Sequence, residues 1–126
     1  MGFFDRLFGG SGSKPAIEQI DPATAHERVR RKDLVLVDVR TAEEWQGGVA
    51  KGAYMVTLGS PTMVDTIYGL LKEDASKPVA VICRSGMRSG RAAKLLAQAG
   101  FTDVSNVRGG MMAWTAANLP TQAYRR

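Results

Sequence analysis

A single cysteine, Cys83, lies between a hydrophobic run and a polar, arginine-containing loop. The run Val79–Ile82 is apolar and partly β-branched, which is typical of a buried strand in a parallel sheet. From Ser89 to Ala99 apolar residues recur with helical spacing, and Gly100 then ends the pattern. The sequence therefore predicts a strand that ends at a thiol, followed by a loop and an amphipathic helix.

The predicted helix start beside Cys83 favours a negatively charged sulfur. The first backbone N–H groups of a helix have no partner within the helix, and the helix dipole adds partial positive charge there. A loop curled over this end would turn several N–H groups towards the sulfur, and Arg84 and Arg88 flank it. We therefore expect a lowered pKa for the Cys83 thiol and a reactive thiolate. The alternative is that Cys83 is a small buried apolar residue, as many free cysteines are.

A second apolar run, Leu34–Val39, predicts a central strand of the same sheet. Parallel strands bring their carboxyl ends to one edge, where the sites of α/β proteins form. Asp38 and Arg40 should therefore lie near the Cys83 loop. From the residues alone they could organise the site or form a purely structural ion pair. Thr41 and Glu44 match a capping box at the start of a short helix.

Further strands and helices alternate along the chain, which predicts a compact α/β domain. The other expected strands are Ile17–Ile20, Ala53–Val56 and Val104–Val107, and the other expected helices are Ala23–Arg31 and Pro61–Glu73. Asp21 should cap the first of these helices, with Pro22 at its first position. The only histidine, His26, is expected at the surface of that helix and not as a catalytic base.

Four segments resemble the single-domain rhodaneses, a family of sulfurtransferases, and follow the order of that family. They are LVLVDVRTAEEW at 34–45, GA at 52–53, CRSGMRS at 83–89 and GGMMAW at 109–114. The resemblance covers roughly residues 16–119 and implies one rhodanese-like α/β domain with a largely parallel five-stranded sheet and helices on both faces. Residues 1–15 would then be an apolar leader with a Gly/Ser linker, and residues 120–126 a basic tail.

The resemblance implies that Cys83 is the nucleophile of a sulfurtransferase. A sulfane sulfur would pass from thiosulfate or a persulfide to Cys83, and from the Cys83 persulfide to a thiol, protein-thiol or cyanide acceptor. Arg84 and Arg88 are the expected contacts of the small anionic donor, and Asp38 and Arg40 would support the site. The complete predicted donor-binding set is Arg84, Ser85, Gly86, Met87, Arg88 and Ser89.

One segment departs from the family pattern. The family commonly has G-H-I-P-G-A, whereas residues 48–53 of this chain read GVAKGA. Val49 therefore stands at the histidine position and Lys51 at the proline position. The departure leaves the thiol chemistry unchanged, but it removes any inference about acceptor recognition that would rest on that histidine.

Two other functions compete with sulfur transfer. Phosphatases and arsenate reductases of related fold place five residues between the cysteine and the arginine of their loop, whereas four lie between Cys83 and Arg88. The shorter loop should suit one sulfur atom better than a tetrahedral oxyanion. The other alternative is a non-catalytic module that binds an anion, a persulfide or a partner protein through the same loop.

Composition sets further limits on function. The chain has 126 residues and a net charge of +5, which would attract small anions. No basic stripe alternates with aromatic residues, so nucleic-acid binding is not expected. One cysteine excludes an internal disulfide and a C-x-x-C zinc site, and neither a metal nor a cofactor is expected. An unpaired reactive thiol favours a reducing compartment, so the expected location is cytoplasmic.

The first residues of the chain are unusually apolar. Phe3, Phe4, Leu7 and Phe8 could share one side of two helical turns, and the sequence GGSGS at 9–13 then forms a flexible linker. This segment is either a leader resting on the domain or a weak contact, through residues 3–8, with a membrane or a protein partner. No apolar run is long enough to span a membrane.

Overall fold

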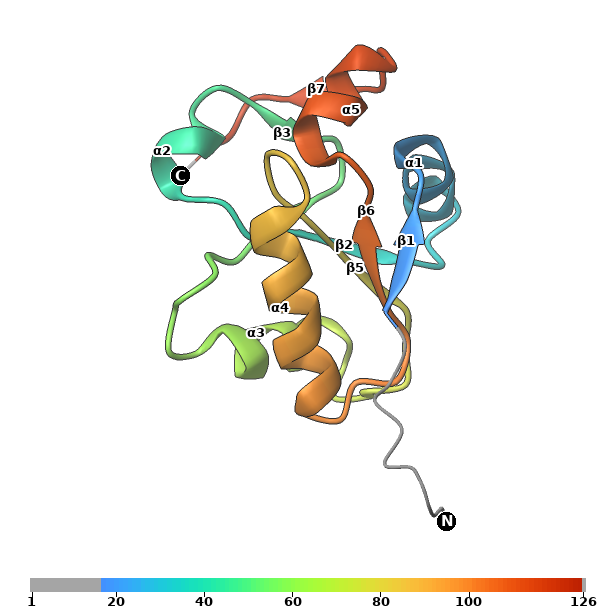
Figure 1. Cartoon of the computed structure of the whole chain (residues 1–126), viewed down its shortest axis with the longest axis vertical. Coiled ribbons are helices and arrows are strands. Elements are labelled where there is room, and N and C mark those ends of the chain that lie inside the picture. The colour runs from blue at the N-terminus through green and yellow to red at the C-terminus, as the bar shows by residue number, and fades with distance from the viewer. Residues whose placement is uncertain (1–16, 126) are drawn as a thin grey trace.

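A five-stranded parallel sheet forms the centre of the protein. The computed structural model describes residues 17–125 (Figure 1). The strands are β1 (Glu18–Ile20), β2 (Val35–Asp38), β4 (Tyr54–Met55), β5 (Val79–Ile82) and β6 (Val104–Val107). Their order across the sheet is β1-β6-β5-β2-β4, and all four neighbouring pairs are parallel. The predicted parallel sheet is confirmed, with β5 and β2 side by side near its middle.

Helices cover both faces of this sheet, as predicted. They are α1 (Pro22–Arg30), α2 (Ala42–Trp45), α3 (Met63–Leu70), α4 (Met87–Gln98) and α5 (Gly110–Ala116). One apolar core joins Val81 to Ile67 of α3 and Leu96 of α4, whereas the other joins Ile82 to Trp114 of α5. In Figure 1, α4 crosses in front of the strands.

Side-chain alternation along β5 decides which way the cysteine points. All four residues of β5 are buried, as expected for a central parallel strand. Val79, Val81 and Cys83 belong to the core under α3 and α4, whereas Ala80 and Ile82 belong to the opposite core. Because successive side chains of a strand point to opposite faces, Cys83 is directed towards the α4 side of the sheet.

A small second sheet was not predicted. β3 (Val49–Ala50) pairs antiparallel with β7 (Thr121–Gln122). The Pro120 carbonyl also accepts hydrogen bonds from Trp114 Nε1 at 2.8 Å and from the Lys51 N–H at 3.0 Å. The assignment of residues 120–126 to a tail is therefore wrong for the segment around β7. β3 and β7 have only two residues each, too few for an alternating pattern to be recognised in the sequence.

Two residues at α1, Asp21 and His26, differ from their predicted roles. Asp21 occupies the N-cap position of α1 but makes no capping hydrogen bond, because its carboxylate pairs instead with Arg108 at 2.6 Å. His26 is half-buried rather than at the surface, and its ring packs edge-on against Trp114 with the ring centres 5.7 Å apart.

The predicted leader and linker, with the contact through residues 3–8, lie outside the described residues. Within residues 17–125 no helix is long and apolar enough to cross a bilayer.

Candidate active site

The end of β5 presents Cys83 to the first turn of α4. The loop that follows reaches Gly86, the N-cap residue of α4, which has a left-handed backbone with φ of 106°. This conformation favours glycine because it has no Cβ. It allows the Gly86 N–H to donate a hydrogen bond to Cys83 Sγ at 3.0 Å. The predicted strand, thiol loop and helix are confirmed, and a backbone amide points at the sulfur.

A serine hydroxyl is the second group that contacts the sulfur. Ser89 is buried in the first turn of α4, and its Oγ lies 3.3 Å from Cys83 Sγ. The same hydroxyl lies 2.5 Å from Asn106 Oδ1 on β6. A hydroxyl has one proton to donate, so Asn106 and the sulfur compete for it. Ser89, predicted as part of the donor-binding set, is thus placed against the sulfur itself.

Asn106 fixes both groups that contact the sulfur. Its Nδ2 donates to the Gly86 carbonyl at 3.1 Å and to Gln19 Oε1 at 3.2 Å, while its Oδ1 accepts from Ser89. The side chain is buried and therefore held in one orientation by these three bonds. Asn106 was not among the predicted site residues. Its position in a buried strand, where a polar residue needs partners, is the signal that would have found it.

The surroundings of the sulfur favour the thiolate. Burial alone would raise the pKa of the Cys83 thiol, but hydrogen bonds outweigh this effect and hold the pKa below its usual value. They come from the Ser89 hydroxyl and from the backbone N–H groups of Ser89, Gly86 and Ser85. The Cys83 side chain has no exposed surface, but these hydrogen bonds distinguish its sulfur from that of a cysteine buried among apolar groups alone.

The start of α5 holds the loop from its other side. The N–H of Met111 donates to the Cys83 carbonyl at 2.8 Å, and the N–H of Met112 donates to the Arg84 carbonyl at 3.0 Å. The start of α5 approaches the loop so closely at Gly110 that an added Cβ would collide with the Cys83 carbonyl oxygen. The glycine pair at the start of α5, part of the GGMMAW segment, thus lets α5 pack closely against the loop.

Arg88 is engaged by a carboxylate. Its two terminal nitrogens donate to Glu44 Oε1 at 2.7 Å and to Glu44 Oε2 at 2.8 Å. The Arg88 hydrogen bond is the main reason why the pKa of Glu44 falls to about 2, although burial acts in the opposite direction. Glu44 also closes the predicted capping box with Thr41, which is confirmed. An anion that binds Arg88 must therefore compete with Glu44.

Asp38 and Arg40 form a buried pair next to the site. The Asp38 carboxylate accepts from the Arg40 N–H at 2.9 Å, from its guanidinium at 2.9–3.1 Å and from Trp45 Nε1 at 3.2 Å. Arg40 also donates to the Gly48 carbonyl at 2.8 Å. Asp38 lies opposite Ile82 in the sheet, one residue before Cys83. These contacts fix the segments around the site, and none of them involves the sulfur.

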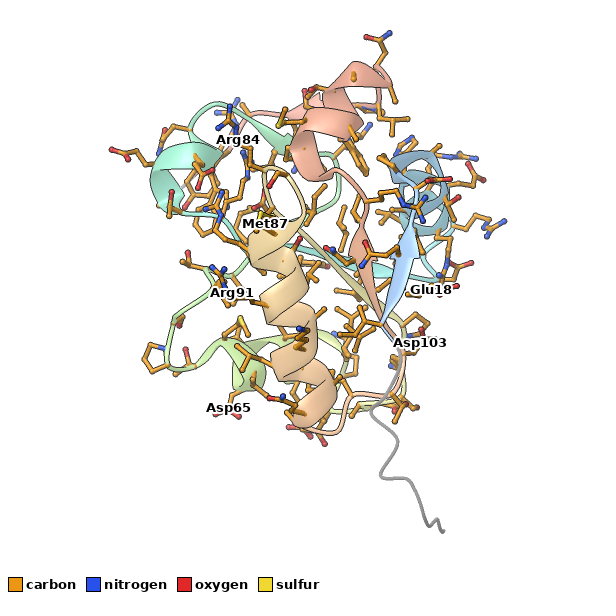
Figure 2. The ribbon with its side chains drawn as sticks, in the orientation of Figure 1. Glu18, Asp65, Arg84, Met87, Arg91 and Asp103 are labelled. Carbon is orange, nitrogen blue, oxygen red and sulfur yellow. The ribbon has the colours of Figure 1, made fainter. Side chains whose placement is uncertain are left out.

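The remaining loop residues face outward. Arg84, Ser85 and Met87 are exposed, and Figure 2 places Arg84 and Met87 at the end of α4 that adjoins the loop. A shallow pocket of about 300 Å³ opens between the loop and α5, with Arg84, Arg40 and both Met111 and Met112 in its lining. Within residues 17–125 no cluster of three or more His, Cys, Asp or Glu side chains could hold a metal ion.

Comparison with known proteins agrees with this geometry. Residues 21–117 match the rhodanese-like domain family. The thiosulfate sulfurtransferase GlpE of Vibrio cholerae is 36% identical over 104 residues, which cover 82% of this chain and 93% of that protein. The solution structure of the rhodanese-like domain of Anabaena Alr3790 matches with a TM-score of 0.74 and 26% identity. The match covers 86% of this chain and 81% of the Alr3790 domain. The polysulfide-sulfur transferase homodimer of Wolinella succinogenes has a TM-score of 0.67 at 28% identity, covering 90% and 83% respectively.

Proposed function

Because this chain belongs to the rhodanese-like family and is a sulfurtransferase, we propose that Cys83 carries the transferred sulfur as a persulfide. The donor is a small anion with a sulfane sulfur, with thiosulfate as the model compound, or a persulfide. The acceptor is a thiol, a protein thiol or cyanide. A reducing, cytoplasmic location is part of the same proposal, because the mechanism needs an unpaired thiol.

The reaction has two displacement steps. The Cys83 thiolate attacks the outer sulfur of thiosulfate, the S–S bond of thiosulfate breaks, and sulfite leaves with the bonding electron pair. An acceptor thiolate then attacks the outer sulfur of the Cys83 persulfide, which releases the Cys83 thiolate and a persulfide of the acceptor. Electrons balance without an oxidant or reductant, and the covalent intermediate predicts ping-pong kinetics.

The observation that supports this proposal is the set of donors around Cys83 Sγ. The Gly86 N–H at 3.0 Å and the Ser89 hydroxyl at 3.3 Å stabilise a negative sulfur before the reaction and after sulfite has left. Arg84 is exposed at the mouth of the loop and is available to attract the donor anion. Because Cys83 has no exposed surface, the outer loop residues must move when the donor enters.

The phosphatase alternative loses support at the length of the loop. Four residues lie between Cys83 and Arg88, one fewer than in the loop of those phosphatases. The short loop also leaves the Gly86 amide in direct contact with the sulfur, where a bound oxyanion would need space. We therefore retain sulfur transfer as the proposed reaction of this loop.

Mass analysis of the intact protein tests the proposal. The protein is incubated with thiosulfate and compared with Cys83→Ala treated in the same way. The expected result is a gain of one sulfur atom that is absent in Cys83→Ala and is removed by a thiol or cyanide. No gain of sulfur from thiosulfate or from a low-molecular-weight persulfide would refute the Cys83 persulfide and favour the binding module.

A further inference from the structure

A second, larger groove runs along α4, away from the pocket at α5. Its volume is about 700 Å³, within the range of small-molecule sites. One wall is α4, with Arg88, Arg91 and Lys94, and the opposite wall is the segment after β4, with Thr57 and Leu58. Figure 2 shows Arg91 on the side of α4 that faces this segment.

The charge of this groove is entirely positive. Arg88, Arg91 and Lys94 line it, and no carboxylate does. Arg88 is paired with Glu44, whereas Arg91 and Lys94 are exposed and make no ion pair with any residue of the described segment 17–125. A rise of ~1.5 Å per residue along a helix places Lys94 roughly 9 Å from Arg88 along α4. The groove therefore offers two uncompensated positive charges beyond Arg88.

The base of the groove is apolar. Val39 and Leu58 contribute to its lining, and Leu95, which is 45% exposed, forms part of its α4 wall. No aromatic side chain lines it, so it lacks the stacking platform that single-stranded nucleic acids use. Cations above an apolar floor suit a short carbon chain with more than one negative group.

The groove is joined to the reactive sulfur through Arg88. This residue lies in the first turn of α4, next to the Gly86 and Ser89 donors, and it also lines the groove. The pKa of Arg88 is raised mainly by its hydrogen bond to Glu44, and the negative charge of Cys83 adds to this rise because the two groups are near each other. A molecule whose thiol reaches Cys83 can therefore extend its far end along α4 towards Lys94.

We propose that this groove binds the acceptor, and that the acceptor is a low-molecular-weight thiol with two carboxylates, held by Arg91 and Lys94. The inference rests on the proposed function, because it assigns the substrate of its second step. In this proposal, the positive charges of the groove favour dianionic acceptors over neutral ones, and contacts with the reacting sulfur do not decide the choice.

A series of simple thiols tests this selectivity. Persulfide-loaded protein is mixed with 2-mercaptoethanol, 3-mercaptopropionate or mercaptosuccinate, which carry no, one and two carboxylates. The variant is Arg91→Gln/Lys94→Gln. Its matched control is Arg31→Gln/Lys77→Gln, which removes the same charges from exposed positions outside the groove. Each variant is compared with the unmodified protein for one acceptor at a time, so differences in thiol reactivity cancel.

The expected result is a loss of kcat/KM that grows with acceptor charge. Exposed ion pairs contribute modestly, so we expect about a tenfold loss for mercaptosuccinate, about threefold for mercaptopropionate and under about twofold for 2-mercaptoethanol. The control variant should change all three by under about twofold. Added salt should reduce the advantage of mercaptosuccinate in the unmodified protein. Equal losses for all three acceptors, or no loss, would overturn the proposal.

Binding to protein that cannot react separates this inference from the sulfur chemistry. S-methylated mercaptosuccinate is titrated into Cys83→Ala and followed by NMR. Shifts of the Arg91 and Lys94 amides that disappear in Arg91→Gln/Lys94→Gln support the groove even if no persulfide forms. Absence of these shifts overturns the groove whatever Cys83 does. Binding of an acidic peptide without binding of the dicarboxylate would overturn the small-molecule assignment in favour of a protein segment.

Discussion

Replacing Ser89 by alanine should raise the pKa of the Cys83 thiol, because the Ser89 hydroxyl is one of the hydrogen bonds that hold this pKa down against the effect of burial. A hydrogen bond to a charged group stabilises it by about 1.5–3 kcal/mol. Full donation by the hydroxyl at 3.3 Å would therefore favour the thiolate by at least about tenfold. Because Asn106 Oδ1, at 2.5 Å, competes for the same proton, we expect the loss in Ser89→Ala to be about tenfold and not more.

The pKa of Cys83 can be measured without a turnover assay. The ultraviolet absorbance of the thiolate is followed against pH in the unmodified protein and in Ser89→Ala. Alkylation by iodoacetamide is measured over the same range, since only the thiolate reacts. At a pH below both pKa values, the smaller thiolate fraction of Ser89→Ala should slow alkylation about tenfold. The Gly86 N–H remains in place in the variant, so the pKa should stay below that of a free cysteine.

Ser105→Ala is the matched control. Ser105 is also a buried serine, on β6, and its hydroxyl has no hydrogen-bond partner among the described residues. Removing it deletes a buried hydroxyl without touching the sulfur, so the pKa of Cys83 should not change. An unchanged pKa in Ser89→Ala, or an equal rise in Ser105→Ala, would refute the claim that the Ser89 hydroxyl stabilises the thiolate.

Three further substitutions test the contacts around the loop, and Gly100→Ala serves as the control for one of them. Glu44→Gln should lower the KM for thiosulfate in steady-state kinetics, because it frees Arg88 to bind the anion. Arg88→Ala should strongly reduce thiosulfate turnover while changing the free energy of unfolding, measured with urea, only a little. A higher KM in Glu44→Gln, or unchanged turnover in Arg88→Ala, would contradict the role given to Arg88. The pKa of Glu44 is about 2 in the folded protein, so its pairing stabilises the fold above about pH 4.5 and this contribution disappears as the pH falls towards 2. Both side chains of the pair are about 30% exposed, so we expect the pair to contribute about 1–2 kcal/mol to the free energy of unfolding at neutral pH. This contribution should be missing in Glu44→Gln, and the difference between the two proteins should become small as the pH falls through about 2. Gly110→Ala should destabilise the protein by about 3 kcal/mol or more, because its Cβ would collide with the Cys83 carbonyl. Gly100→Ala should cost only about 1–2 kcal/mol, because Gly100 also has a positive φ but open space around it. Equal costs in urea unfolding would show that the close approach at Gly110 is unimportant.

Elements with strong local signals could be predicted from the sequence. The run Val79–Ile82 and the helical spacing after Ser89 encode β5 and α4 within a few residues of the observed bounds. Parallel strands share their carboxyl edge, and that rule alone brought Asp38 next to the Cys83 loop. The family resemblance added the identity of the reaction, which no spacing could have supplied.

Contacts between distant residues could not be predicted in the same way. Glu44 was recognised only as part of a capping box, although its carboxylate also holds Arg88, which is 44 residues further along the chain. Asn106 and Gln19 are 87 residues apart, and no local pattern links them. Such contacts depend on how strands are ordered in the sheet, and this order follows from the packing of the whole domain. The pairing of β3 with β7 was missed for the same reason.

The last strand gives the end of the chain a role in the geometry of the loop. β7 covers Val49, which is fully buried, and two residues later Tyr124 packs on Trp45 at 5.3 Å between ring centres. Trp45 Nε1 donates a hydrogen bond to Asp38, and Trp45 follows Glu44, the ion-pair partner of Arg88, in the sequence. Deleting residues 120–126 would uncover this layer and loosen α2. Trimming the carboxyl terminus to obtain a minimal domain would therefore alter reactivity, even though every loop residue from 83 to 89 would still be present.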